Sequence, residues 1–266
     1  CGNVSIRWMC SIALDSCVPS CPWSSIFAQT QSMDRRTMPA SGQYVSYCEI
    51  VSFMVMVFGF SQHLIEAQTL NCFNNWLTSD DRHIFLDFHN AVRRIVALGR
   101  QPNVDEFLPS ASNMYKMKWS CILEDEVNER LNRCDGKQQP LEGFGLNIHE
   151  LTEFIPKQRP TMEIKRTLAE WWSVLDEHKI NEPSSSVIAE RFQKVANILH
   201  DRTTQIGCSY AFCNKLYIGC MYHLNGTTQD GNLYTEGPFC THDTDCTIYQ
   251  PSRCLDGLCI KGLFGV

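Results

Sequence analysis

Apolar residues recur at helical spacing over residues 79–99 of the chain. Ser79 and Asp80 suit the start of a helix, because their side chains can accept hydrogen bonds from its free N–H groups. Gly99 suits the end. The pattern predicts a helix whose buried face consists of Ile84, Phe88, Val92 and Ile95.

Three further segments show the same spacing and predict helices over residues 120–133, 163–178 and 188–199. Each has an apolar residue on one face at nearly every turn. The residues expected to face the core are Leu123, Val127 and Leu131, then Ile164, Leu168, Trp171 or Trp172 and Leu175, then Phe192, Val195 and Leu199.

The pattern changes after residue 204, where β-forming residues are frequent on both sides of Asn214. Residues 205–213 and 215–223 therefore predict a β-hairpin. From Thr235 the chain is rich in turn residues and cysteine, and it is too short to bury a core, so disulfides must hold it. Helices followed by paired strands predict an α+β layer fold.

Composition indicates a globular protein, with 44% hydrophobic and 20% charged residues in a chain of 266. The formal charge is −6, and no basic run offers a surface for a phosphate backbone. We therefore expect no nucleic-acid partner.

Fifteen cysteines change the picture more than any other residue type. Zinc sites usually show repeated CxxC pairs, and the sequence has none. So many cysteines without metal-site spacing indicate disulfides formed in an oxidising compartment.

An uncharged apolar run at residues 50–60 is about half as long as the roughly 20 residues of a membrane-spanning helix. A small residue, Ala67, follows it, as in a signal peptide, and Met33 with the charges after it could supply the start. We expect a signal peptide region at 33–67, no stable membrane insertion, and a secreted product. Residues 1–32 are then an upstream or disordered extension; the alternative is a genuine cysteine-containing extension.

Cleavage after Ala67 would turn an odd number of cysteines into an even one, as five disulfides require. The ten that remain are Cys72, Cys121, Cys134, Cys208, Cys213, Cys220, Cys240, Cys246, Cys254 and Cys259. In a secreted chain, Asn225-Gly226-Thr227 would be a glycosylation sequon, so Asn225 is a candidate glycosylation site.

Six short blocks of the chain lie at 89–93, 108–121, 128–134, 169–172, 203–208 and 220–240. The motif residues among them are His89, Asn90, Arg93, Trp171, Trp172, Gly231, Asn232 and Tyr234. In this order the blocks resemble the CAP (SCP/TAPS) superfamily, in particular its helminth venom-allergen-like and Ancylostoma-secreted-protein branch. The tail from Cys240 to Cys259 resembles the hinge of this branch.

The resemblance implies a three-layer α-β-α sandwich at residues 68–234, followed by a short disulfide-stapled hinge at 235–266. It also implies that Cys208 pairs with Cys220 and Cys213 with Cys134. The pairing of the other six cysteines stays open. The role of His89 and Asn90 is expected to be structural, and core packing is preferred to a lipid groove for the two adjacent tryptophans.

Many members of this family hold a divalent metal in a cleft with two His and two Glu. The matching positions here carry Leu146 and Val174 for the carboxylates and Lys194 for one imidazole, and no His lies between Cys134 and His149. Leucine and valine have no ligand atoms, and an ammonium repels a metal ion. We therefore expect no metal, no cofactor and no catalytic residues.

These observations favour a secreted, non-enzymatic protein that works through an extracellular protein partner, of the host-modulating or immune-modulating type that the resemblance implies. The first alternative is a sterol or fatty-acid carrier, because the two apolar replacements would make the cleft more apolar. The second is a secreted metal-dependent hydrolase, which needs the groups that these positions lack.

Overall fold

The computed structural model describes residues 70–136, 141–152, 159–180, 190–226 and 233–262. The chain divides into two units, residues 1–66 and 67–266, and all described residues belong to the second. The expected signal region and upstream extension lie outside the described residues. No helix within the described ranges is long and apolar enough to cross a membrane.

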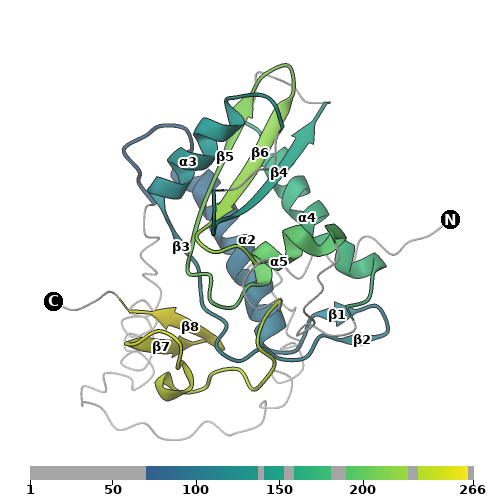
Figure 1. The fold of residues 1–266 in the computed structure, drawn as a ribbon, viewed down its shortest axis with the longest axis vertical. Coiled ribbons are helices and arrows are strands. Elements are labelled where there is room, and N and C mark those ends of the chain that lie inside the picture. Colours follow the sequence, from purple (N-terminus) through teal and green to yellow (C-terminus); the bar gives the residue numbers. More distant parts are fainter. Residues whose placement is uncertain (1–69, 137–140, 153–158, 181–189, 227–232, 263–266) are drawn as a thin grey trace, which may run out of the picture. The chain divides into compact units, whose positions relative to one another are not determined.

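A four-stranded sheet forms the centre of the second unit (Figure 1). The predicted hairpin is confirmed: β5 (Gln205–Phe212) pairs antiparallel with β6 (Leu216–Tyr222), with Cys208 opposite Cys220. The sequence did not reveal the outer strands, β4 (Gly145–Leu151) and β3 (Lys118–Trp119). β4 is antiparallel to β6, and the two-residue β3 is parallel to β5.

One face of the sheet is covered by α3 (Cys121–Leu131), which begins after the N-cap Ser120, as the pattern predicted. Leu123, Val127 and Leu131 pack there against residues of β4, β5 and β6. α3 lies so close to β5 that a Cβ on Gly207 would be 2.2 Å from the backbone nitrogen of Glu124. Only glycine permits this approach at that position.

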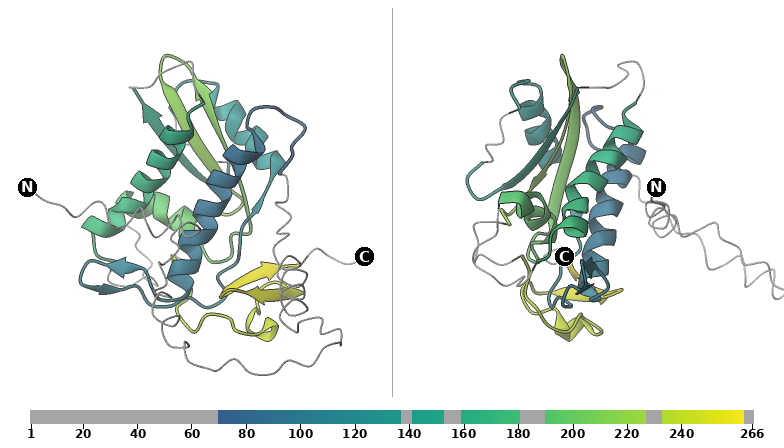
Figure 2. Two further views of the ribbon diagram at one scale, coloured as in Figure 1. Left: turned by 180° about the vertical axis from the view of Figure 1, so that it is seen from behind. Right: turned by 90° about the vertical axis from the view of Figure 1, so that its right-hand side faces the viewer.

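The opposite face is covered by α2 (Ser79–Ala97) and α4 (Thr161–Glu177) (Figure 2). α5 (Gln193–Leu199), preceded by the 3₁₀ turn η1 (Glu190–Phe192), packs against both of these helices through Val195, Ala196 and Leu199. The three layers make the α-β-α sandwich that the resemblance implied. The predicted start of the last helix, residues 188–189, lies outside the described residues.

The first helix differs from its prediction in its cap and its buried face. Thr78, rather than Ser79 or Asp80, is the N-cap: its Oγ1 accepts from the Asp81 N–H at 3.2 Å, and Asp81 accepts from the Thr78 N–H at 3.1 Å. Ile84 and Phe88 are only partly buried, whereas Phe85 and His89 are fully buried. The apolar pattern misplaced the face because α2 also buries polar side chains, which a hydrophobic pattern counts as exposed.

α4 begins two residues earlier than predicted and ends within one residue of the predicted end. Trp171 is buried with Ile164, Leu168 and Leu175, whereas Trp172 is only partly buried. Of the two tryptophans that could have faced the core, Trp171 is therefore the one that does.

Two small hairpins complete the described chain. β1 (Pro102–Asn103) pairs with β2 (Glu106–Phe107), and in the tail β7 (Ser252–Leu255) pairs with β8 (Leu258–Lys261) after the 3₁₀ turn η2 (Asp243–Asp245). The tail is joined to the sandwich by a hydrogen bond from the Lys116 N–H to the Cys259 carbonyl at 2.8 Å.

All ten cysteines expected in the mature chain are paired. Cys134 bonds to Cys213 and Cys208 to Cys220, the two pairs that the family resemblance implied. The pairings that the sequence left open are Cys72–Cys121, Cys240–Cys254 and Cys246–Cys259. Two of the five therefore staple the tail, which is too short to hold itself by burial.

Candidate functional site

The three cleft positions with replaced ligands have different surroundings. The Leu146 side chain on β4 is buried among the apolar residues beneath α3. Val174 on α4 is partly buried against the cluster that α2, α4 and α5 share. Lys194 on α5 places its Nζ 5.9 Å from the centre of the Trp171 ring, a cation–π contact.

His149 and Glu170 lie near this lysine. Neither residue was expected from the sequence to belong to a site. His149 Nε2 is 3.4 Å from Glu170 Oε2, and the His149 side chain is 16% exposed. Burial lowers the pKa of His149, the Glu170 carboxylate raises it, and the Lys194 ammonium lowers it. Burial also lowers the pKa of Lys194, with Glu170 opposing. Alternation along β4, which puts Asn147 and His149 on one face, is the signal that could have found this histidine.

These residues do not fit a divalent metal. His149 and Glu170 offer two ligands, but the third polar group is an ammonium, which carries the same sign of charge as the metal. In the described ranges, the one cluster of three potential ligand atoms within 4.8 Å is formed by Cys240, Cys246 and Cys259. All three sulfurs are in disulfides, so none is a thiolate ligand.

His89 is the first member of a buried hydrogen-bond chain that joins α2 to the sheet and to α5. Its Nδ1 is 2.7 Å from the Phe85 carbonyl oxygen, which can only accept, so Nδ1 carries the proton. Nε2 then accepts from the Tyr222 hydroxyl at 2.9 Å. Burial lowers the pKa of His89 to about 4, and burial raises the pKa of Tyr222 well above its usual value.

The chain continues from β6 to β4, α5 and the loop after β6, with every donor pointing back toward His89. Asn147 Nδ2 donates to the Tyr222 hydroxyl at 3.1 Å, and Asn197 Nδ2 donates to Asn147 Oδ1 at 2.9 Å. The Gly226 N–H donates to Asn197 Oδ1 at 3.1 Å. Because each group has a partner of the right kind, the chain fixes the layers relative to one another rather than holding a proton to donate.

Asn90 and Arg93, the other residues of the first motif, bind backbone. The Asn90 amide makes two hydrogen bonds to Met117, accepting from its N–H at 2.8 Å and donating to its carbonyl at 3.0 Å. The fully buried Arg93 guanidinium donates to five carbonyl oxygens, those of Tyr115, Ile198, His200, Asp201 and Thr203. Burial lowers its pKa to about 9, against the opposing effect of the Asp201 carboxylate. These contacts agree with the structural role expected for the motif.

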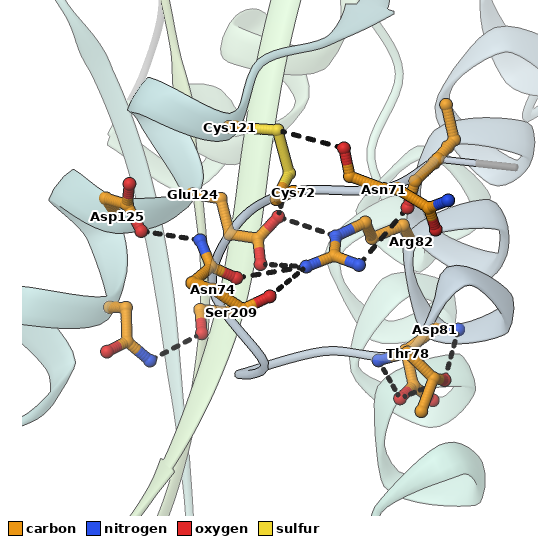
Figure 3. A network of polar contacts seen from close by, with 12 residues as sticks. Asn71, Cys72, Asn74, Thr78, Asp81, Arg82, Cys121, Glu124, Asp125 and Ser209 are labelled. Carbon is orange, nitrogen blue, oxygen red and sulfur yellow. Dashed lines mark hydrogen bonds and ion pairs between the residues drawn. A yellow bond between two sulfur atoms is a disulfide. The ribbon is translucent and has the colours of Figure 1, made fainter.

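A second buried charge lies between α2 and α3 (Figure 3). Arg82 Nε donates to Glu124 Oε2 at 2.8 Å, and its NH2 group donates to Oε1 at 2.7 Å. Trp119 Nε1 also donates to Glu124 Oε2, at 2.7 Å. Both charged side chains are almost completely buried. This pair could not be predicted from the sequence, because its two members are 42 residues apart and carry no local pattern.

The remaining predicted site residues are only partly described. Tyr234 is buried and its hydroxyl donates to the Pro109 carbonyl at 2.8 Å. Gly231, Asn232 and the sequon residue Thr227 lie outside the described residues. Asn225 is half-buried, and its backbone N–H donates to the Gly143 carbonyl at 3.0 Å.

Comparison with known proteins places these features in one family. The model of CAP, the cysteine-rich secretory protein family, matches residues 86–222. The Ancylostoma secreted protein of Ancylostoma caninum is 32% identical over 192 residues, which make up 72% of this chain and 45% of that protein.

Solved structures agree. Na-ASP-1 aligns with a TM-score of 0.67 at 31% identity, over 74% of this chain and 49% of its own. BmVAL-1 aligns with a TM-score of 0.64 at 25% identity, over 73% of this chain and 100% of its own. This chain thus spans about half the length of the Ancylostoma protein and of Na-ASP-1. With the family model matching just over half of its residues, the chain belongs to the cysteine-rich secretory protein (CAP) family.

Proposed function

We propose that this protein is secreted and acts by binding another protein outside the cell, in the manner of a host or immune modulator, without catalysing a reaction. The observation that carries the proposal is which side chains occupy the positions matched to the family's metal ligands. Leu146 and Val174 pack in apolar clusters, and Lys194 lies over Trp171. A metal-dependent reaction would need ligands at these positions, and these side chains supply none.

The framework supports a binding role, because it is held rigid from several directions. Five disulfides and the buried networks of His89, Arg93 and Arg82 fix the layers and the tail. Such a scaffold can present surface residues to a partner with little loss of conformational entropy. Cleavage after Ala67 belongs to the proposal, since it keeps all ten paired cysteines in the mature chain.

The carrier alternative draws less support from the structure than from the sequence. It depended on Leu146 and Val174 making the cleft more apolar. The Leu146 side chain is instead packed under α3, and Val174 contacts the cluster around α5. Side chains that already fill a core are not free to line a ligand cavity.

Native mass spectrometry of residues 68–266, secreted from eukaryotic cells, tests the proposal. The expected species is a polypeptide with five disulfides and no bound small molecule, together with a glycan at Asn225 that an amidase removes. Stoichiometric zinc would contradict the argument from the cleft positions and favour the hydrolase. Stoichiometric sterol or fatty acid would favour the carrier.

A further inference from the structure

Large apolar side chains are exposed both on the segment before α2 and at the start of α3. Phe73 is fully exposed and Ile122 is 76% exposed, the two highest values among the large apolar residues of the described ranges. Trp76, on the same segment as Phe73, is 54% exposed. Exposed apolar side chains that gather in one place mark interaction sites, whereas isolated ones need no explanation.

A disulfide joins the chain next to the first two of these residues. Cys72 bonds to Cys121, and their Cα atoms are 5.5 Å apart. Phe73 directly follows the first cysteine and Ile122 directly follows the second. The disulfide therefore holds the backbone at these two exposed residues close together, although the bonded cysteines are 49 positions apart in the sequence.

The segment that carries Phe73 and Trp76 is fixed along its length (Figure 3). Asn74 Nδ2 donates to Asp125 Oδ1 on α3 at 2.6 Å, and Asn74 Oδ1 accepts from the buried Arg82 at 3.0 Å. Arg82 also donates to the Leu70 carbonyl at 3.2 Å. The apolar residues thus stay exposed on a segment whose backbone is held in place, and a partner would lose little entropy in ordering it.

Acidic residues continue this surface along α3. Ile122, Asp125 and Glu129 are three and four residues apart, which puts them on one face of the helix, and all three are exposed. Arg133, two residues beyond the end of α3, is exposed as well. Carboxylates beside an apolar patch attract a cationic partner and repel the anionic headgroups of a lipid surface.

We propose that this surface, formed by Phe73, Trp76, Ile122, Asp125 and Glu129, binds a protein segment that presents apolar side chains next to lysine or arginine. We refer to it as the Cys72 surface. The proposal rests on the proposed function and names the surface and the partner chemistry through which it works. The aromatic residues would be buried against the partner's apolar side chains. The carboxylates would orient the partner and favour one that is positively charged.

The test uses the full secreted chain and a synthetic amphipathic helix with leucines on one face and lysines beside them. A matched peptide carries glutamate in place of every lysine. Fluorescence anisotropy should show binding of the lysine peptide alone, weakened about tenfold or more by Phe73→Ser and by Ile122→Ser. Phe107→Ser is the matched control, because Phe107 is 62% exposed on β2, outside this surface, and it should leave the affinity unchanged.

A second variant separates charge from apolar contact. Asp125→Asn with Glu129→Gln keeps both shapes, and the amide oxygen introduced at position 125 would still accept from Asn74. We expect weaker binding of the lysine peptide and a smaller loss of affinity on adding salt.

Several results would overturn the proposal. These are equal binding of both peptides, no effect of Phe73→Ser, or the same loss in Phe107→Ser. A dimer that Phe73→Ser dissociates would assign the surface to a second copy of the chain. Binding to phosphatidylserine vesicles that Phe73→Ser abolishes would assign it to lipid. A failure of the proposed function gives a different result, because zinc or lipid would be seen in the native mass spectra whether or not Phe73 is replaced. A protein that carries neither zinc nor lipid and binds neither peptide would keep the proposed function and contradict only this surface.

Discussion

Two groups of polar residues on the same side of the sheet are arranged in opposite ways. Beneath α2, His89, Asn90 and Arg93 are buried, and their hydrogen bonds reach main-chain groups or other buried side chains. Beside α4 and α5, Glu170 is largely exposed and Lys194 partly exposed, and a 3.4 Å ion contact and a cation–π contact link the group.

The difference indicates that the first group stabilises the fold, whereas the second group does not. The residues on α2 bind backbone of several segments, so replacing them should destabilise this fold. The positions matched to the family's ligands carry Leu146, Val174 and Lys194, and the chain has its fold with these residues in place. The comparison therefore predicts large effects on stability in the first group and small, local effects in the second.

Arg93→Met should have the largest effect, because it removes a buried guanidinium that donates to five carbonyl oxygens. The carbonyls of His200 and Asp201 keep a backbone donor, and the other three lose the guanidinium as donor. We expect the free energy of unfolding, measured by urea denaturation, to fall by about 5 kcal/mol or more. The free energy of unfolding of Arg93→Lys should lie between those of Arg93→Met and the native protein. Arg100→Met, at an exposed arginine, is the control and should change stability by less than about 0.5 kcal/mol. If Arg93→Met were as stable as the control, the guanidinium would not hold these segments.

Glu124→Ala should come next, because it removes the carboxylate that pairs with the buried Arg82 guanidinium and accepts from the Trp119 N–H. Among the described residues, Arg82 would keep only the neutral acceptors of Asn74 and Leu70. The expected loss in the same urea experiment is about 3–5 kcal/mol. Glu129→Ala, an exposed glutamate on the same helix, provides the matched comparison. Similar losses in both variants would mean that helix propensity, rather than the buried pair, accounts for the result.

Much of the fold could be predicted because it follows local patterns. Leu123, Val127 and Leu131 gave α3 its buried face, and the β-forming runs around Asn214 gave the hairpin. β4 was not predicted although Leu146, Asn147, Ile148 and His149 alternate between apolar and polar. Asn147 is buried on the face opposite Leu146 and Ile148, so the strand lacks the exposed polar face that alternation usually indicates. The cap at Thr78 depended on a side-chain contact with Asp81 rather than on the apolar pattern.

The candidate site could be predicted only as a set of replaced positions. Family motifs located Leu146, Val174 and Lys194, yet Leu146 faces α3 rather than the other two. His149 and Glu170 come from a strand and the helix that follows it, and their contact depends on how α4 lies against β4 rather than on a local pattern. The Cys72 surface required the disulfide pairing, which spacing alone leaves open.

A pH dependence of stability should come from His89, whose pKa is lowered to about 4 by burial. The unfolded chain protonates near pH 6.5 while the folded one does not, so stability falls as the pH drops from about 6.5 to about 4. The contribution of His89 over that range is about 3 kcal/mol. Urea unfolding at pH 7 and pH 4.5 should show a smaller loss between the two pH values in His89→Gln, and an unchanged loss in His242→Gln, at an exposed histidine. A native-sized loss in His89→Gln would assign the dependence to other groups.

Lys194→Met should have the smallest effect on stability, a loss of less than about 1 kcal/mol for one cation–π contact. Its signature is electrostatic instead. The Lys194 ammonium lowers the pKa of His149, so removing it should raise that pKa in an NMR titration. Glu170→Gln removes the carboxylate that raises the same pKa and should move it in the opposite direction. Opposed shifts with nearly native stability would show that this group holds charges near one another without supporting the fold. Equal shifts of the His149 pKa in the two variants, or a loss of stability as large as that of Arg93→Met, would contradict the distinction between the two groups of polar residues.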